Sequence, residues 1–321
     1  MKHSVVVSSS ILTIGTIIFC FSFIHPAEAT YSIAAADLTN GLIGAAATTC
    51  LKVQDLSIYD ALYHSIPGNQ SKTNKGSLLL TQGLLSDEND PHLNLALELM
   101  KNGTDPDSIL KNITDPTVDN GQDYREPDYS LRQYGLVNMN GEAASYTGNK
   151  LDSLYDFYGY DSSEQKDVQG TKTSAGGTSY VFSAQGNIVS ETLVDTVVNA
   201  FDGCDLAESL YLALISPSTK NLGDVRCAED EIVGSIAFLH VESADEGVTS
   251  LHIDVEYEVN SSGKVIDPLV SLRSQYVEWR KQQPYNSKCS VDIDTPSSGV
   301  EEKIAYHFLL FVPFLLTVIF L

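Results

Sequence analysis

The stretch that decides the fold runs from Thr30 to Thr49, TYSIAAADLTNGLIGAAATT. Asn40-Gly41 in its middle is a strong signal for a tight hairpin turn, and the residues on either side are small or favour β-strands. The flanking segments 31–37 and 42–49 are apolar at odd and even positions alike, whereas a strand with one solvated face would alternate. The sequence therefore predicts an antiparallel hairpin at the centre of a sheet that is covered on both faces.

The rest of the chain predicts further strands and helices around this hairpin. Strands are expected over 77–82, 131–137, 142–147, 178–184, 233–241 and 251–259. Apolar residues at helical spacing predict helices over 91–101, 105–112, 205–215 and 268–283, and one more helix capped by Ser190. The polar segment 151–177 is predicted to be a loop. This order favours a single α+β domain over 30–297 with antiparallel sheets, in which 268–283 is a helical C-terminal extension.

The N-terminal segment 1–29 has the composition of a secretory signal peptide. A short basic start is followed by the apolar block 11–24 and by the small-residue site Ala27-Glu28-Ala29. Cleavage after Ala29 would make Thr30 the first residue of the mature protein. The alternative is an uncleaved membrane anchor, for which the apolar stretch is marginal in length.

The C-terminal segment 298–321 has the pattern of a GPI-attachment signal. Small residues that begin at Ser297 are followed by the polar spacer 300–307 and by the apolar tail 308–321, FLLFVPFLLTVIFL. Ser297 is the predicted attachment site, so the membrane would be reached through a lipid anchor. The alternative is a single-pass or tail-anchored helix, for which this tail is short.

Four N-glycosylation triplets agree with a eukaryotic secretory route to the cell surface or the extracellular space. They begin at Asn69, Asn102, Asn112 and Asn260. The whole chain carries 42 acidic and 19 basic residues, a formal net charge of −23. A surface this acidic repels nucleic acid and anionic lipid, so neither is expected as a partner. The oligomeric state is left open.

The cysteines predict disulfides. Cys20 would leave with the leader, and Cys50, Cys204, Cys227 and Cys289 would remain in an oxidising compartment. Their spacing matches no zinc motif. Two bridges are expected, and although four cysteines allow three pairings, Cys204–Cys227 is favoured as the first.

Common catalytic motifs are absent from the sequence. It contains no G-x-S-x-G, no H-E-x-x-H, no P-loop and no G-x-G-x-x-G that opens a helix, and we expect no cofactor and no metal. His252, Asp254, Glu256 and Glu258 share one face of a predicted strand, which would allow a metal-carrying surface. A half-buried strand explains the same alternation and is favoured.

Thr30 is the sharpest candidate for chemistry. If cleavage follows Ala29, its α-amine has a pKa near ~7.7–8 and stands beside its own hydroxyl. One residue would then supply both the nucleophile and the base, a known variant of triad logic. The alternative is that some residue must come first and that threonine is ordinary there.

Several short segments together resemble one known family. They are Thr30–Asp37, Gly41–Ala47, Arg132–Val137 with Tyr146-Thr147-Gly148, Ala184-Gln185-Gly186-Asn187, Gly223-Asp224-Val225-Arg226, and Asp267-Pro268 with Leu272-Arg273. In order and spacing they resemble the uncharacterised family catalogued as domain of unknown function 1028, over most of Thr30 to about Arg280.

The resemblance implies a fold and a chemistry. The family is similar to N-terminal-nucleophile (Ntn) hydrolases, which implies a four-layer αββα sandwich and amidohydrolase chemistry by Thr30. The substrate would be an unknown small-molecule or peptide-like amide. In this hypothesis Asp224 and Arg226 orient the site as an ion pair, or are only a loop salt bridge. Gln185, Gly186 and Asn187 form a turn whose backbone N–H groups bind the substrate oxyanion, or a purely structural turn.

The chain also departs from the family pattern. Thr49-Cys50 stands where the family often has Ser-Lys, with Lys52 as the nearest lysine, and Gly234 replaces a glutamine. A nearby cation would help to keep the amine unprotonated, so its displacement weakens the enzyme hypothesis. The alternative function is a catalytically inactive, GPI-anchored binding or adhesion protein on the same fold.

Overall fold

The structure is a computed structural model, and it describes residues 30–51, 57–70, 76–83, 90–115, 117, 128–151, 163–174 and 177–283. The predicted signal peptide, the predicted GPI-attachment signal with Ser297, and both Lys52 and Cys289 lie outside the described residues. Within the described ranges, no helix combines the length and the apolar character needed to cross a membrane.

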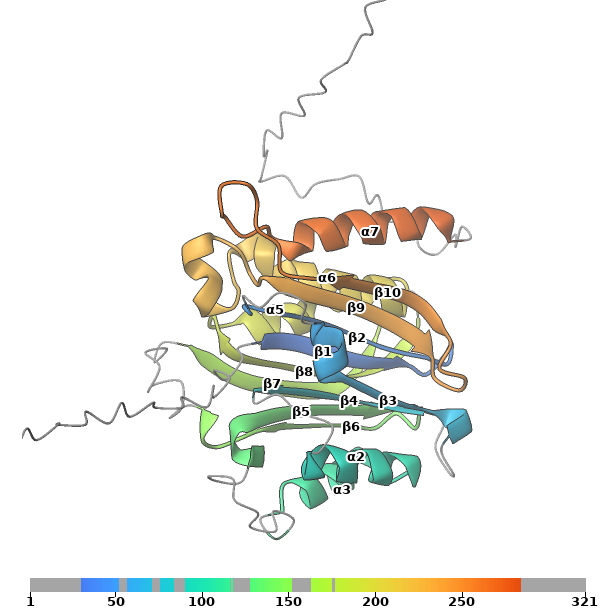
Figure 1. Cartoon of the computed structure of the whole chain (residues 1–321). Helices are drawn as coiled ribbons and strands as arrows, with labels where there is room; N and C mark the ends of the chain where they lie inside the picture. The colour runs from blue at the N-terminus through green and yellow to red at the C-terminus, as the bar shows by residue number, and fades with distance from the viewer. Residues whose placement is uncertain are drawn as a thin grey trace, which may run out of the picture. The chain divides into compact units, whose positions relative to one another are not determined.

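A six-stranded antiparallel sheet contains the predicted hairpin in its interior (Figure 1). Its strand order is β10-β9-β2-β1-β8-β7. The hairpin is confirmed: β1 pairs with β2 from Asp37 opposite Leu42 to Thr30 opposite Thr49. The strands are β1 (Thr30–Asp37), β2 (Leu42–Thr49), β7 (Glu164–Thr173), β8 (Ser179–Val189), β9 (Ile236–Ser243) and β10 (Thr249–Val255).

A second, four-stranded sheet is also antiparallel. Its order is β3-β4-β5-β6, with the strands β3 (Tyr63–Pro67), β4 (Gly76–Gly83), β5 (Arg132–Asn138) and β6 (Ala143–Thr147). The predicted strands at 77–82, 131–137 and 142–147 are confirmed, whereas β3 was not predicted. The fold is thus mixed α and β with two antiparallel sheets, as the order of elements indicated.

Helices cover one face of each sheet. One apolar cluster joins the six-stranded sheet to α5 (Leu193–Ala200), α6 (Leu206–Ile215) and α7 (Pro268–Gln282). Another joins the four-stranded sheet to α2 (Pro91–Lys101) and α3 (Pro106–Ile113). A third cluster lies between the two sheets and includes the short helix α1 (Ile58–Leu62). The faces of the sheets that carry no long helix therefore face each other, which is visible in Figure 1.

The small side chains of the hairpin let these layers approach. At Gly44 an added Cβ would lie 2.4 Å from the backbone oxygen of His240 and 3.1 Å from Leu210 of α6. Alanines fill the neighbouring positions on both faces and are buried. The apolar, alternation-free pattern of 31–37 and 42–49 is therefore explained by burial between a helix layer and a second sheet.

Three predictions about local structure are wrong. The segment 151–177 is not a loop throughout, because β7 lies within it at the edge of the sheet; its polar sequence EQKDVQGTKT hides the strand. Ser190 does not cap a helix: its N–H donates to the Gly223 carbonyl oxygen at 2.9 Å, and α5 follows Thr192, which has φ 67° and no capping side chain. The predicted strand 251–259 ends at Val255.

The pH dependence of the unfolding free energy tests whether the side chain of His64 on β3 is buried. His64 lies on this strand, and burial lowers its pKa to about 4. Because an unfolded histidine titrates near ~6.5, the unfolded state binds the extra proton as pH falls from about 6.5 to 4 and the folded state does not. The unfolding free energy should therefore fall over this window, and less so in His64→Gln. Denaturant unfolding of both proteins across the window measures this; parallel curves would contradict it.

Candidate functional site

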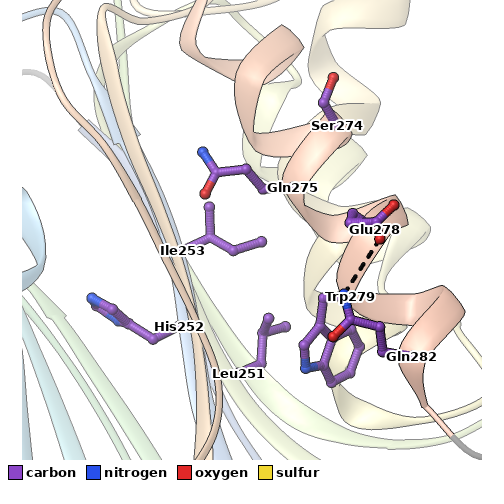
Figure 2. Close-up of a pocket in the computed structure, with 8 residues that line it drawn as sticks. All are labelled: Leu251, His252, Ile253, Ser274, Gln275, Glu278, Trp279 and Gln282. Atoms are coloured by element: carbon purple, nitrogen blue, oxygen red, sulfur yellow. Dashed lines mark hydrogen bonds between the residues drawn. The ribbon is translucent and has the colours of Figure 1, made fainter.

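Strand β10 was one of two candidate sites, and it is a half-buried strand as favoured. Leu251, Ile253 and Val255 pack toward α7, whereas His252 lies on the opposite face of the strand (Figure 2). A shallow pocket between β10 and α7 is lined mainly by apolar side chains and amides. In the part of the chain that the structure describes, no group of three or more His, Cys, Asp or Glu could hold a metal ion.

The side chain of Thr30 faces the second sheet. Along β1, Tyr31, Ile33 and Ala35 belong to the cluster with the helices, so the residues between them face the other way. The hydroxyl of Ser32 donates across the gap to Oε1 of Gln82 on β4, at 3.1 Å. By strand alternation Thr30 shares this face, and it is buried with 1% of its surface exposed.

Two polar residues flank Thr30 within its own sheet. The register pairs it with Thr49 at the end of β2 and with Asn187 on β8. Both side chains are buried, and both lie at the end of the gap where polar residues replace the alanines of the apolar cluster. The beginning of β1 is therefore the place where a nucleophile could meet donors from two neighbouring strands.

A network of buried carboxamides crosses from one sheet to the other at this end. Gln133 on β5 is its centre: its Oε1 accepts hydrogen bonds from Nε2 of Gln82 at 2.7 Å and from Nδ2 of Asn187 at 2.9 Å. Its Nε2 donates to the Gly186 carbonyl oxygen at 3.0 Å and to Oγ1 of Thr147 at 2.9 Å. These bonds fix which way the Asn187 amide points, so they orient a group beside Thr30.

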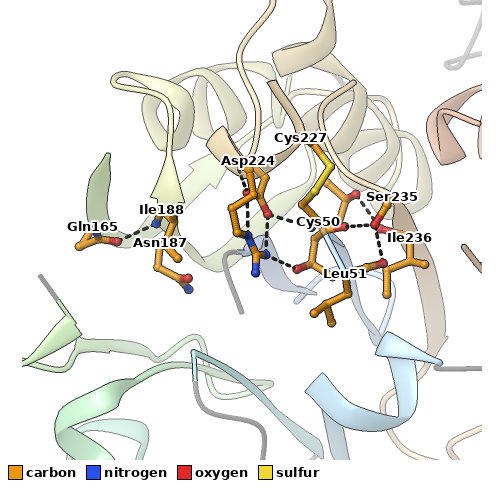
Figure 3. A network of polar contacts seen from close by, with 12 residues as sticks. Cys50, Leu51, Gln165, Asn187, Ile188, Asp224, Cys227, Ser235 and Ile236 are labelled. Atoms are coloured by element: carbon orange, nitrogen blue, oxygen red, sulfur yellow. Dashed lines mark hydrogen bonds and ion pairs between the residues drawn. A yellow bond between two sulfur atoms is a disulfide. The ribbon is translucent and has the colours of Figure 1, made fainter. Parts of the chain in front are cut away.

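Asp224, labelled in Figure 3, forms the predicted ion pair with Arg226, and this pair is buried. The side chain of Asp224 is 0% exposed and that of Arg226 11%. The carboxylate accepts from Nη2 of Arg226 at 2.8 Å and from the backbone N–H of Cys50 at 2.8 Å. Burial raises the pKa of Asp224, and the guanidinium and backbone N–H groups oppose that rise.

Arg226 connects this ion pair to the end of β1. Its Nη2 also donates to Oγ1 of Thr49 at 3.3 Å, and Thr49 is the register partner of Thr30. Just beyond, Ser235 donates its backbone N–H to the Thr49 carbonyl oxygen at 2.8 Å and its hydroxyl to the Leu51 carbonyl oxygen at 2.6 Å. The structure therefore brings Thr30, Asn187, Asp224 and Arg226 into one neighbourhood.

A disulfide between Cys50 and Cys227 joins the end of β2 to the segment that follows Asp224 and Arg226. The two Cα atoms are 5.7 Å apart. The predicted Cys204–Cys227 bridge is therefore wrong. The end of β2 meets the 3₁₀ segment Val225–Asp230, which carries Cys227, and sequence spacing could not reveal that encounter. Cys204 is itself disulfide-bonded.

The predicted oxyanion turn is also wrong. Gln185, Gly186 and Asn187 lie inside β8, between β1 and β7, and α5 begins only at Leu193. Gln185 and Gly186 pair with both β1 and β7, whereas Asn187 pairs with Thr30 of β1 and falls at a register shift in the β7 pairing. What this segment presents toward Thr30 is a side-chain amide, that of Asn187.

Sequence reasoning missed the carboxamides of Gln82 and Gln133. Gln133 lies within the segment Arg132–Val137 that resembles the family, but no role was assigned to it, and Gln82 belongs to no motif. The one available signal is that both interrupt otherwise apolar faces: Leu78 and Leu80 precede Gln82 on its face, and both are in the core between the sheets. Gln82 and Gln133 form a network only because β4 and β5 of one sheet face β8 of the other.

Comparisons with known proteins match the chain to one family model. A family model described as "Family of unknown function (DUF1028)" matches residues 30–260. No curated protein matches the chain. Among solved structures, the crystal structure of protein SPO2555 from Silicibacter pomeroyi, described by the same family model, is 19% identical with a TM-score of 0.46; the match covers 82% of this chain and 98% of that one.

A double-mutant cycle tests the buried ion pair. Arg226→Gln should lower the unfolding free energy by about 3–5 kcal/mol, because it leaves the Asp224 carboxylate buried without its cation. Adding Asp224→Asn should recover part of the loss. The partly exposed pair Lys166–Asp195 is a matched control, since Lys166→Gln should cost less than about 1 kcal/mol. Equal, small losses for Arg226→Gln and Lys166→Gln would contradict the buried pair.

Proposed function

The chain belongs to the DUF1028 family of unknown function, and on this premise we propose that it is a cell-surface hydrolase that uses Thr30 as an N-terminal nucleophile on an amide bond. One observation carries the proposal: the side chain of Thr30 faces the polar end of the gap between the sheets, beside Thr49 and Asn187. The family match also begins at residue 30, where cleavage after Ala29 would start the mature chain.

The proposed fold type follows the same premise. Two antiparallel sheets face each other, and helices cover their outer faces, which supports a four-layer αββα sandwich of the Ntn-hydrolase type. In such an arrangement the first residue of a central strand carries the nucleophile, so the place of β1 between β2 and β8 agrees with the proposal.

The proposed reaction needs no group besides Thr30 and water. Its α-amine takes the Oγ proton while Oγ attacks the amide carbonyl, and the tetrahedral intermediate then expels the amine, which receives that proton. The acyl group is left as an ester on Thr30. Water attacks this ester with the α-amine again as base, and the carboxylic acid product leaves with Thr30 restored.

Asn187 and Arg226 have supporting roles in the proposal. The Asn187 amide, oriented by Gln133, would help to stabilise the oxyanion. The Arg226 guanidinium, bonded to Thr49, would lower the pKa of the neighbouring amine and keep it unprotonated, the effect that a lysine at this point of the family would have. Asp224 would hold that guanidinium in place, and Gln185 and Gly186 would contribute to binding as part of β8.

A second candidate is an inactive binding or adhesion protein with the same fold. The observation that favours it is Cys50, which stands where the family often has lysine and whose sulfur is bonded to Cys227. The four glycosylation triplets, whose asparagines are all exposed, would suit either function at a cell surface.

The nucleophile is tested by the N-terminus and by two substitutions. Mass spectrometry of the secreted protein should find Thr30 first. Covalent labelling by a panel of β-lactone and activated-amide probes should disappear in Thr30→Ala and persist in Thr30→Ser, which keeps a hydroxyl beside the amine. A different first residue would refute the nucleophile, and equal labelling of wild type and Thr30→Ala would favour the binding protein.

The lipid anchor is tested on cells. Phosphatidylinositol-specific phospholipase C should release the protein from the surface, and Ser297 substituted by a bulky residue should reduce surface display. Substitution of Ser261 in the glycosylation triplet at Asn260, which is not the attachment residue, serves as the control. Protein that stays on the cells after phospholipase treatment would favour a membrane-spanning tail.

A further inference from the structure

A pair of histidines lies on the six-stranded sheet outside the Thr30 site. His240 on β9 and His252 on β10 are direct partners in the strand register, and their Nδ1 atoms are 3.1 Å apart. His240 alternates with Leu239 and Val241, which face the helices, so both rings lie on the sheet face that carries no long helix. His240 is also opposite Ala45 of β2, well along the strand from Thr49.

A carboxylate determines which ring nitrogen of His240, the more buried histidine of the pair, carries the proton. Nε2 of His240 lies 3.3 Å from Oε2 of Glu242, which is two residues further along β9 on the same face. An ionised carboxylate can only accept a hydrogen bond, so it places the ring proton on Nε2. In the neutral ring, Nδ1 of His240 therefore carries the lone pair, and this nitrogen lies beside Nδ1 of His252. A carboxylate behind a histidine in this way orients metal-ligating imidazoles in many proteins.

Tyrosine rings hold the pair in position. Tyr59 of α1 packs on both imidazoles, with ring centroids 4.8 Å from His240 and 4.6 Å from His252. Tyr63 lies 4.8 Å from His240. His240 is 2% exposed, whereas His252 is exposed to solvent. The ring of His240 is thus held in place, and the ring of His252 is accessible to solvent.

We propose that His240 and His252 together bind a divalent transition-metal ion, with Cu²⁺ preferred to Zn²⁺. Two imidazole nitrogens at ~2.05 Å from one ion are about 2.9 Å apart at a right angle and about 3.4 Å apart at a tetrahedral angle. The observed 3.1 Å lies between these values. Binding requires only that His252 carry its proton on Nε2, which frees its Nδ1 lone pair.

The surroundings favour a cation of this kind. Imidazole suits copper and zinc, and the affinity order of divalent ions places Cu²⁺ above Zn²⁺. The carboxylates of Glu242 and Asp254 lie near, and the chain is strongly acidic, so the local potential concentrates cations. Since the described residues provide no third ligand of the same kind, water would complete the coordination, and exchange with solvent would be easy.

Titration calorimetry with CuCl₂ and with ZnCl₂, in a buffer that does not chelate metals, tests the site in the full secreted protein. We expect one Cu²⁺ ion to bind at the pair more tightly than Zn²⁺. His252→Ala, at an exposed position, should weaken this event at least about tenfold, and Glu242→Gln should weaken it about ten- to a hundredfold. Glu256→Gln, at an exposed position just after β10, is the control and should bind as wild type does.

A second readout locates the ion. Bound Cu²⁺ should quench tyrosine fluorescence in step with the calorimetric event, because Tyr59 packs on both rings, and the quenching should be lost in His252→Ala. Thr30→Ala should leave it unchanged, which separates this site from the proposed nucleophile. Wild type that binds no Cu²⁺, or His252→Ala that binds it as tightly as wild type while unfolding at the same temperature, would overturn the proposal.

Discussion

The fold depends on two central strands that are buried on both faces. β1 and β2 have the helix layer on one side and the second sheet on the other, and alanine and glycine let both approach. A larger side chain at Gly44 would meet the backbone of β9 and the side chain of Leu210. Because protein interiors are packed to crystal-like density, such positions tolerate little change in volume. The beginning of β1 is consequently held in a fixed place.

Polar groups at that end of the gap replace apolar packing with hydrogen bonds. A buried carboxamide or ion pair destabilises a protein unless its partners are supplied, and here Gln133 and Asp224 each have several. Networks of this kind permit one arrangement of side chains rather than many. The polar residues at this end of the gap therefore hold the surroundings of Thr30 in one arrangement. The alanine-lined end of the same gap is ordinary hydrophobic core.

The sequence predicted the elements whose reasons are local. Asn40-Gly41, the doubly apolar strands and the helical spacing of apolar residues in α2 and α6 are explained by turn geometry and burial within a few residues. β7 was missed because its polar residues give no sign of pairing with β8. At the site, Asp224 and Arg226 are close in sequence and their pairing was predicted, whereas the Cys50–Cys227 bridge, the carboxamide network and the His240–His252 pair depend on strand register, which no local pattern specifies.

The Cys50–Cys227 bridge joins residues separated by 177 positions, and this has a consequence for biosynthesis. During translation the hairpin can form early, since its turn and both strands are consecutive. Asn187, Asp224 and Arg226 emerge from the ribosome only after most of the domain, so the beginning of β1 receives its neighbours last. If the predicted leader is removed early, Thr30 would thus stay without these neighbours until the chain is nearly complete. The order of synthesis itself would delay any reactivity until the protein has folded.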